Sequence, residues 1–235
     1  VAKGRMDEVK QAALLNLVSP TADAADLKGC ELIIEAVFEQ RQLKAQVTHD
    51  AEPMLAAGGM FASNTSTLPI GGLAQASAAP QRFVGLHFFS PVHKMKLVEI
   101  IRGRSTDDET VARAYDYVLA LGKTPIVVND SRGFFTSRVF GTYVMEGVAM
   151  LAEGVHPRSI EVAGLQAGMP MPPLALQDEV SLSLGLHVAD QTKKDLASEG
   201  KAYVDHPGMT VIRQLCEIGR VGKKAGQGFY DWADD

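Results

Sequence analysis

Short apolar segments alternate with amphipathic patterns over the first 130 residues of the chain. The apolar segments are typical of strands buried in a sheet, and they lie at 32–37, 60–66, 83–89, 96–103 and 124–130. Patterns with helical spacing lie at 5–17, 41–57, 69–76 and 107–121. Because strands that alternate with helices are typical of parallel sheets, this part predicts an α/β domain.

The pattern changes after Asp130, where long helical patterns replace the strands. They lie at 134–153, 158–167, 174–197 and 209–218, and the segment "GMPMPP" (168–173) separates two of them. We therefore expect an α/β domain over residues 1–130, followed by an all-helical domain over residues 131–235.

Composition narrows the class of protein. With 46% hydrophobic and 22% charged residues, the 235-residue chain has the make-up of an ordinary soluble protein. A net charge of −5 argues against nucleic acid as the main partner, and no apolar run approaches the length of about 18 residues that a membrane span requires. Cys30 and Cys216 form neither a disulfide framework nor a metal pattern, which favours a reducing, cytoplasmic setting without a bound metal.

The stretch "GLHFFSPVHKMKLVEII" (85–101) contains the first candidate site. Strand alternation places His87 on the face opposite Leu86, and Glu99 on the same face as Leu97 and Ile101. A buried carboxylate needs a partner, and His87 lies within reach across a single turn. An imidazole held by a carboxylate is the usual form of a general base, although a purely structural ion pair gives the same pattern.

The polar segment "SNTST" (63–67) contains the second candidate site, at the carboxyl end of an apolar strand. Open α/β sheets bind ligands there, although serine, asparagine and threonine are also common in turns. Ser66, His87 and Glu99 together allow a hydrolase with a serine nucleophile. The G-x-S-x-G elbow that would expose such a nucleophile is absent around Ser66.

Four motifs in the same order resemble one known family across essentially the whole chain. They are "SNTSTLPI", "GLHFFSPVHKMKLVEII", "DSRGFFTSRV" and "GRVGKKAGQGFYDW". The chain resembles L-3-hydroxyacyl-CoA dehydrogenases, especially the dehydrogenase segment of multifunctional fatty acid β-oxidation proteins. The resemblance implies oxidation of an L-3-hydroxyacyl-CoA to a 3-ketoacyl-CoA with NAD as the cofactor.

The resemblance also implies roles for individual residues. His87 would take the proton of the substrate's 3-hydroxyl group, Glu99 would orient and support the imidazolium, and Ser66 would hydrogen-bond the substrate oxygen beside Asn64. Glu39 and Lys44 match cofactor contacts, and Asn64 would also lie near the cofactor.

Two positions depart from the family pattern. Ser90 and Ser137 stand where many members have asparagine. A serine hydroxyl still donates a hydrogen bond but has a shorter reach, so the substrate contacts at these positions are expected to differ.

The glycine-rich G-x-G-x-x-G turn that usually binds a dinucleotide is absent from the sequence. In the family this turn belongs to a first β-α-β unit, which would precede Val1. The expected fold is therefore a Rossmann-like parallel sheet that lacks its first β-α-β unit, followed by an all-α C-terminal domain. We expect the chain to be a fragment that binds NAD weakly or not at all.

The resemblance implies two kinds of partner, an acyl-CoA substrate and another protein subunit. The family's helical domain closes the substrate cleft and commonly dimerises, so we expect a homodimer through this domain or a place in a multifunctional β-oxidation complex. Two alternatives remain open: a non-catalytic, truncated acyl-CoA-binding or assembly module, and an acyl-CoA hydrolase that uses Ser66, His87 and Glu99.

Overall fold

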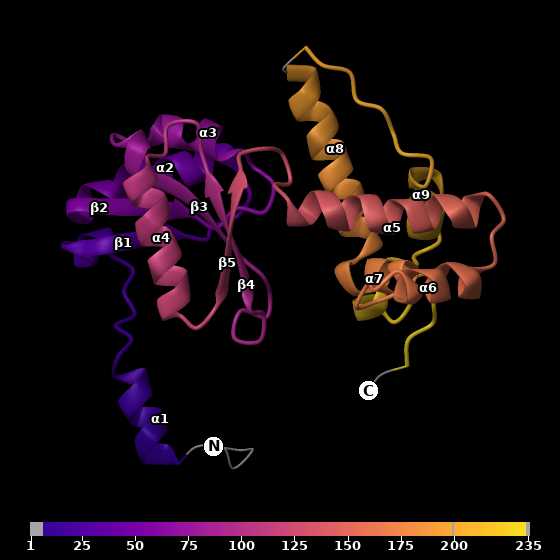
Figure 1. Cartoon of the computed structure of the whole chain (residues 1–235), viewed down its shortest axis with the longest axis horizontal. Coiled ribbons are helices and arrows are strands. Elements are labelled where there is room, and N and C mark those ends of the chain that lie inside the picture. Colours follow the sequence, from indigo (N-terminus) through magenta and orange to yellow (C-terminus); the bar gives the residue numbers. More distant parts are fainter. Residues whose placement is uncertain (1–6, 199, 234–235) are drawn as a thin grey trace. The chain divides into compact units, whose positions relative to one another are not determined.

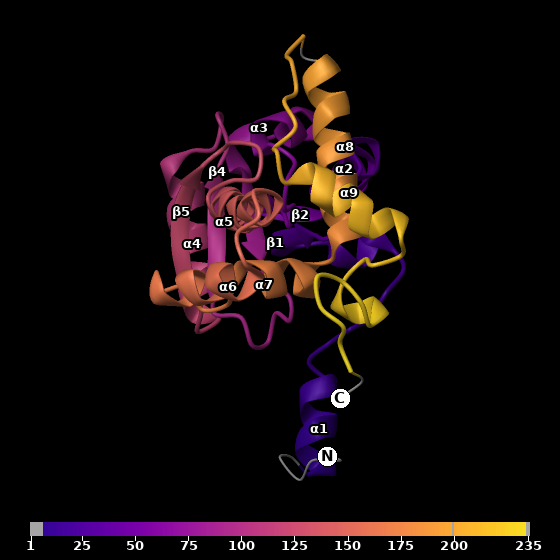
Figure 2. The same cartoon turned by 90° about the vertical axis from the view of Figure 1, so that its right-hand side faces the viewer.

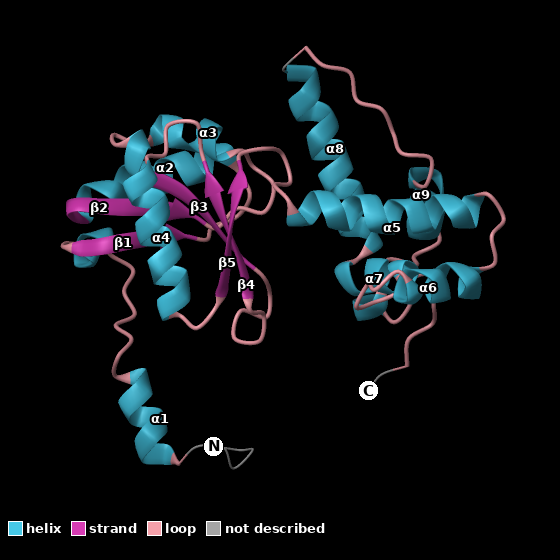
Figure 3. Cartoon of the chain, in the orientation of Figure 1, coloured by secondary structure: helices cyan, strands magenta, loops and turns pink. Residues whose placement is uncertain are grey.

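The computed structural model describes residues 7–198 and 200–233. The chain divides into two compact units, residues 1–136 and residues 137–235. The first unit combines a sheet with helices, whereas the regular elements described in the second unit are helices (Figures 1 and 3). The structure thus confirms the predicted order of an α/β part followed by an all-α part.

The sheet has five strands in the order in which they occur along the chain. They are β1 (Cys30–Glu35), β2 (Leu55–Ser63), β3 (Phe83–Phe88), β4 (Leu97–Arg102) and β5 (Thr124–Asn129). β1, β2 and β3 are mutually parallel, and β4 is parallel to β5. β3 and β4 are antiparallel, because residues 89–96 form a connection too short for the crossover of about a dozen residues that parallel strands need.

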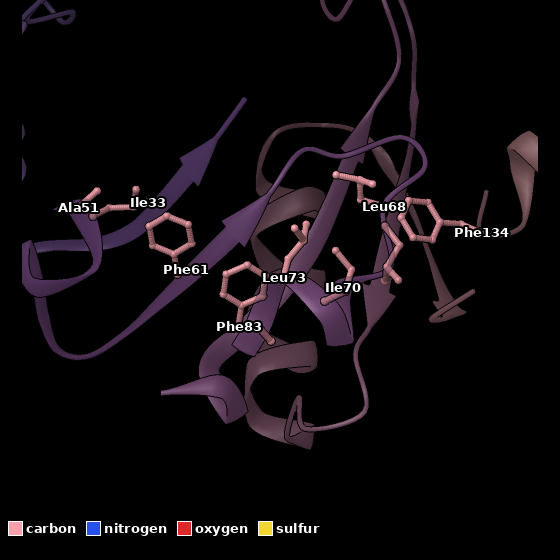
Figure 4. Close-up of a cluster of buried hydrophobic side chains, with 10 residues drawn as sticks. Ile33, Ala51, Phe61, Leu68, Ile70, Leu73, Phe83 and Phe134 are labelled. Carbon is pink, nitrogen blue, oxygen red and sulfur yellow. The ribbon is translucent and has the colours of Figure 1, made fainter. Parts of the chain in front are cut away.

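Helices cover both faces of this sheet. On one face, α4 (Asp108–Ala120) places Ala114 and Val118 against buried side chains of β2, β3 and β4. On the other face, α2 (Arg41–Ala51) and α3 (Ile70–Leu73) pack over a second cluster, shown in Figure 4. That cluster contains Ile33, Ala51, Phe61, Leu68, Ile70, Leu73, Ala74, Phe83, Ile101 and Phe134. The apolar clusters on the two faces of the sheet therefore hold in place the strands that carry the candidate site residues.

The helices of the second unit surround a core of their own. They are α5 (Thr136–Ala152), whose first residue belongs to the first unit, α6 (Pro157–Gln166), α7 (Pro173–Val180), α8 (Leu182–Ser198) and α9 (Met209–Glu217). α6 packs on α7 and α8 packs on α9 (Figure 2). The core contains Val148, Ile160, Leu174, Leu182 and Ile212. No helix among the described residues has the length and apolar character needed to cross a bilayer.

Several predicted boundaries differ from the structure, among them the strand predicted over 60–66, which is β2 at Leu55–Ser63. The helix predicted over 41–57 ends at Ala51, because a short 3₁₀ turn around Pro53 leads into β2 at Leu55. The pattern predicted as one helix over 174–197 is two helices, since Ser181 has a φ of 91° and breaks the helical path. The first predicted helix is observed as α1 (Glu8–Leu15), and residues 5 and 6 of that prediction lie outside the described residues.

Candidate active site

His87 and Glu99 lie directly opposite each other on neighbouring strands. Their positions on β3 and β4 are register partners, and His87 Nδ1 lies 2.6 Å from Glu99 Oε2. His87 is 7% exposed and Glu99 is 0% exposed. The backbone ladder therefore fixes both ends of this pair, and the structure brings together the two residues that strand alternation singled out.

Glu99 also binds the segment that begins helix α5. Its Oε1 accepts hydrogen bonds from the backbone N–H groups of Phe135 (3.0 Å) and Thr136 (2.9 Å), and its Oε2 accepts one from the Thr136 hydroxyl (2.6 Å). These amides belong to a helix start, where N–H groups lack partners within the helix. Thr136 was not predicted as a site residue, because in the sequence it lies inside the helical pattern of 134–153. In the structure it is the first residue of α5, and threonine is common at helix starts, where it binds locally.

These contacts set the charge of the pair. Burial alone raises the pKa of Glu99, but the hydrogen bonds from His87 and Thr136 outweigh it and hold the pKa below its ordinary value of 4.5. An ionised Glu99 only accepts hydrogen bonds, so Nδ1 of His87 carries a proton and Nε2 remains available as a base. Phe89 and Phe134 flank the imidazole, with ring centroids 4.3 Å and 6.0 Å from it.

A pH prediction follows from the lowered pKa of Glu99. A carboxyl group whose pKa is lower in the folded state stabilises the fold above its unfolded value and loses this contribution as pH falls through the folded value. We expect Glu99→Gln to lower the free energy of unfolding at pH 7, and the difference from wild type to shrink below pH 4.5. Urea denaturation monitored by circular dichroism at pH 7 and at pH 3.5 measures both differences in the free energy of unfolding. An equal difference at both pH values would contradict a lowered pKa of Glu99.

The Ser63–Thr67 segment connects the ends of β1, β2 and β3. The Asn64 amide N–H donates to the Glu35 carbonyl (2.8 Å), and Asn64 Oδ1 accepts from the Phe88 N–H (3.0 Å), one residue from His87. Within the described part of the chain, the Asn64 side-chain NH₂ and the Ser66 hydroxyl hold no hydrogen bond. Both groups are therefore available as donors, and Asn64 lies beside the strand that carries His87.

Glu39 and Lys44 have different surroundings. Glu39 Oε1 accepts from the backbone N–H groups of Ser66 and Thr67, each at 3.0 Å, so Glu39 contacts the candidate segment directly. Burial raises the pKa of Glu39, but hydrogen bonds from Thr65, Thr67 and Ser66 and the charge of Lys44 lower it more. The Lys44 side chain is only 1% exposed, and its ammonium group contacts Glu35 and Glu39.

The two serines that replace asparagine lie in different units. Ser90 is exposed in the connection between β3 and β4, beside Pro91. Ser137 is half-buried in the first turn of α5 and is the first residue of the second unit. Among the described residues, no group of three or more histidine, cysteine, aspartate or glutamate side chains is arranged to hold a metal ion.

Two family models match nearly the whole chain. A family model described as "3-hydroxyacyl-CoA dehydrogenase, NAD binding domain" matches residues 1–131, and one described as "3-hydroxyacyl-CoA dehydrogenase, C-terminal domain" matches residues 133–232. These matches confirm the resemblance inferred from the motifs.

Three solved structures are similar over nearly the whole chain. M. tuberculosis FadB2 is 31% identical with a TM-score of 0.85, and (S)-3-hydroxybutyryl-CoA dehydrogenase PaaH1 from Ralstonia eutropha is 32% identical with a TM-score of 0.86. Each similarity covers 99% of this chain and 81% of the other. 3-Hydroxybutyryl-CoA dehydrogenase from Escherichia coli K12 is 30% identical with a TM-score of 0.84, over 100% of this chain and 49% of that one.

The residues present fit one end of the NAD molecule. The Ser66 hydroxyl and the Asn64 NH₂ are unpartnered donors within the described residues, at the carboxyl ends of parallel strands where open α/β sheets bind ligands. Such donors suit the hydroxyl and carboxamide oxygens at the nicotinamide end of the cofactor. The glycine-rich turn that usually holds the pyrophosphate is not among these 235 residues.

Proposed function

Because the chain belongs to the 3-hydroxyacyl-CoA dehydrogenase family, we propose that it oxidises L-3-hydroxyacyl-CoA to 3-ketoacyl-CoA in fatty acid β-oxidation. The observation that carries this proposal is the pair of His87 and Glu99. A buried carboxylate fixes Nδ1 of the histidine at 2.6 Å and leaves Nε2 as the base. The family's NAD-binding domain supplies the cofactor class.

In the proposed reaction, Nε2 of His87 takes the proton from the substrate's 3-hydroxyl group. The electron pair of the O–H bond forms the carbonyl, and the C3–H bond breaks. Bound NAD supplies the hydride acceptor for that C3 hydrogen. Glu99 stabilises the imidazolium as its charge develops, because its carboxylate is already oriented by Thr136 and Phe135 before the substrate binds.

The remaining site residues are proposed to bind the substrate and the cofactor. The Ser66 hydroxyl would donate to the substrate oxygen, and Asn64 would donate to the substrate or the cofactor, since both donors are unpartnered in the described part of the chain. Glu39 is proposed to face the cofactor from its place beside Ser66, with Lys44 behind it. Ser90 and Ser137 are proposed as further substrate contacts through their hydroxyl groups.

We also propose a cytoplasmic enzyme that acts on acyl-CoA substrates and assembles with other proteins. Exposed apolar side chains on the second unit support a homodimer through that unit, or a place in a multifunctional β-oxidation complex. They include Met150 on α5 and Leu184 and Val188 on α8. Apolar groups left in water on helical surfaces favour association with a protein surface.

The test of this function is the oxidation of NADH by acetoacetyl-CoA, followed at the NADH absorbance band. We expect the protein to oxidise NADH at a rate that depends on the concentration of both reactants, with a high KM for NADH because the glycine-rich turn is absent from these residues. Release of a free thiol without any cofactor would instead show the hydrolase that uses Ser66, His87 and Glu99. Binding of acyl-CoA without either reaction would show the non-catalytic module and overturn the proposal.

A further inference from the structure

A buried charged cluster lies behind the Ser63–Thr67 segment. The Lys44 ammonium on α2 lies 3.0 Å from both Oε1 and Oε2 of Glu35, at the end of β1, and also donates to the Val37 carbonyl (3.2 Å). The side chains of Glu35 and Lys44 are each 1% exposed. Such a pair needs good geometry to offset the loss of hydration, and apolar side chains of similar size would often stabilise the fold as well or better.

Glu39 connects this buried pair to the candidate site. Its Oε2 lies 3.4 Å from the Lys44 ammonium, while its Oε1 faces the segment that follows β2. Besides the amides of Ser66 and Thr67, that oxygen accepts hydrogen bonds from the hydroxyl groups of Thr65 and Thr67. The orientation of Glu39 therefore determines where the Ser66 backbone lies.

Glu35 contacts the other end of the same segment. Its Oε1 accepts a short hydrogen bond from the Ser63 hydroxyl, its Oε2 accepts from the Val37 N–H (3.1 Å), and its carbonyl accepts from the Asn64 N–H (2.8 Å). Glu35 thus holds Ser63 and Asn64 directly, and holds Ser66 and Thr67 through Lys44 and Glu39.

We propose that Glu35 is a positioning residue, which acts through Lys44 and Glu39 to hold the Ser66 hydroxyl where it can bind the substrate oxygen. The role of Ser66 in this inference rests on the proposed dehydrogenase function. Glu35 itself touches neither substrate nor cofactor, because its carboxylate is buried and occupied by Lys44, Ser63 and Val37. In this arrangement Lys44 serves as a bridge between two carboxylates.

The first test replaces Glu35 by glutamine and measures amide hydrogen exchange at Ser66 and Thr67 by NMR. Without the Glu35 carboxylate the Lys44 ammonium is no longer held in place, so Glu39 Oε2 loses the contact that orients Oε1 toward the two amides. We expect exchange at both amides to accelerate by about tenfold, the effect of losing one well-formed hydrogen bond.

Glu52→Gln is the matched control. Glu52 likewise accepts from a hydroxyl, that of Ser77, and from a backbone amide, that of Ala78 (2.7 Å). It lies before the start of β2, whereas Ser66 follows the end of that strand. We expect Glu52→Gln to reduce stability without accelerating exchange at Ser66 and Thr67 and without changing turnover.

A second variant covers the case in which Glu35→Gln fails to fold. Glu35→Gln combined with Lys44→Met removes both buried charges together, so neither is left unpaired. It deprives Glu39 of its cation, and we expect the same acceleration at Ser66 and Thr67. If every folded variant at position 35 showed the same exchange rates at Ser66 and Thr67 as Glu52→Gln, the inference would be overturned.

Steady-state kinetics separates this inference from the proposed function. We expect Glu35→Gln to lower kcat about tenfold through the displaced Ser66 hydroxyl, and to raise KM for NADH as well, because Glu39 faces the cofactor in the proposed function. Unchanged kcat with unchanged amide exchange would overturn the inference and leave the dehydrogenase assignment intact. Faster exchange in a protein that never oxidises NADH would support the positioning of the segment and overturn the function.

Discussion

Replacing His87 by glutamine is expected to lower kcat for NADH-dependent reduction of acetoacetyl-CoA by about 10²–10⁴-fold, the usual contribution of a general acid–base group. When the 3-keto group is reduced, His87 donates the proton that completes the 3-hydroxyl group of the product. Glutamine fills a similar volume and can still donate to Glu99 Oε2, but its amide transfers no proton near neutral pH. We therefore expect KM for both reactants to change much less than kcat.

His93→Gln is the control for this substitution. His93 lies in the same β3–β4 connection as Ser90 and is exposed, so its loss tests for an unspecific effect of removing a histidine from this hairpin. We expect the kcat of His93→Gln to remain within about twofold of wild type, as for most exposed positions. A His87→Gln protein that retains wild-type turnover would show that the His87–Glu99 pair is structural.

The pair of His87 and Glu99 could be predicted from the sequence because side chains alternate between the two faces of a strand. Alternation along two neighbouring strands assigns each residue to a face, and a carboxylate between Leu97 and Ile101 requires a buried partner. The register of β3 and β4 then places His87 and Glu99 opposite each other. The same reasoning applies to Glu35 in "ELIIEAVF", which also lies in an apolar run, and it would have identified a second buried carboxylate.

Other features depend on contacts between distant parts of the chain, which periodicity does not reveal. Thr136 binds Glu99 from 37 positions away, and Asp178 binds the C-terminal segment from more than 50 positions away. Each lies in or at a helical pattern whose local sequence is compatible with an exposed polar face. For Lys44, helical spacing predicts the helix but not the burial of its ammonium group, which is determined by Glu35 on a neighbouring strand.

Asp178 organises the end of the second unit through buried hydrogen bonds. Its carboxylate accepts from the backbone N–H groups of Phe229 (2.8 Å) and Tyr230 (3.1 Å) and from Trp232 Nε1 (2.8 Å), and the residue is 1% exposed. A Cβ atom at position 228 would lie 2.0 Å from Asp178 Oδ1, so glycine is required for this close approach. The motif "GQGFYDW" therefore folds against one carboxylate on α7.

Asp178→Ala is expected to lower the free energy of unfolding of the second unit by about 3–5 kcal/mol, because it leaves these buried donors without their acceptor. The fluorescence of Trp232, the single tryptophan of the chain, reports the transition during urea denaturation. Glu179→Ala is the matched control at the next position. Glu179 pairs with Lys223 where both side chains are more than one third exposed, so its loss is expected to cost less than about 1 kcal/mol. If the two variants unfolded at the same urea concentration, the hydrogen bonds to Asp178 would not be what holds the C-terminal segment to the helical unit.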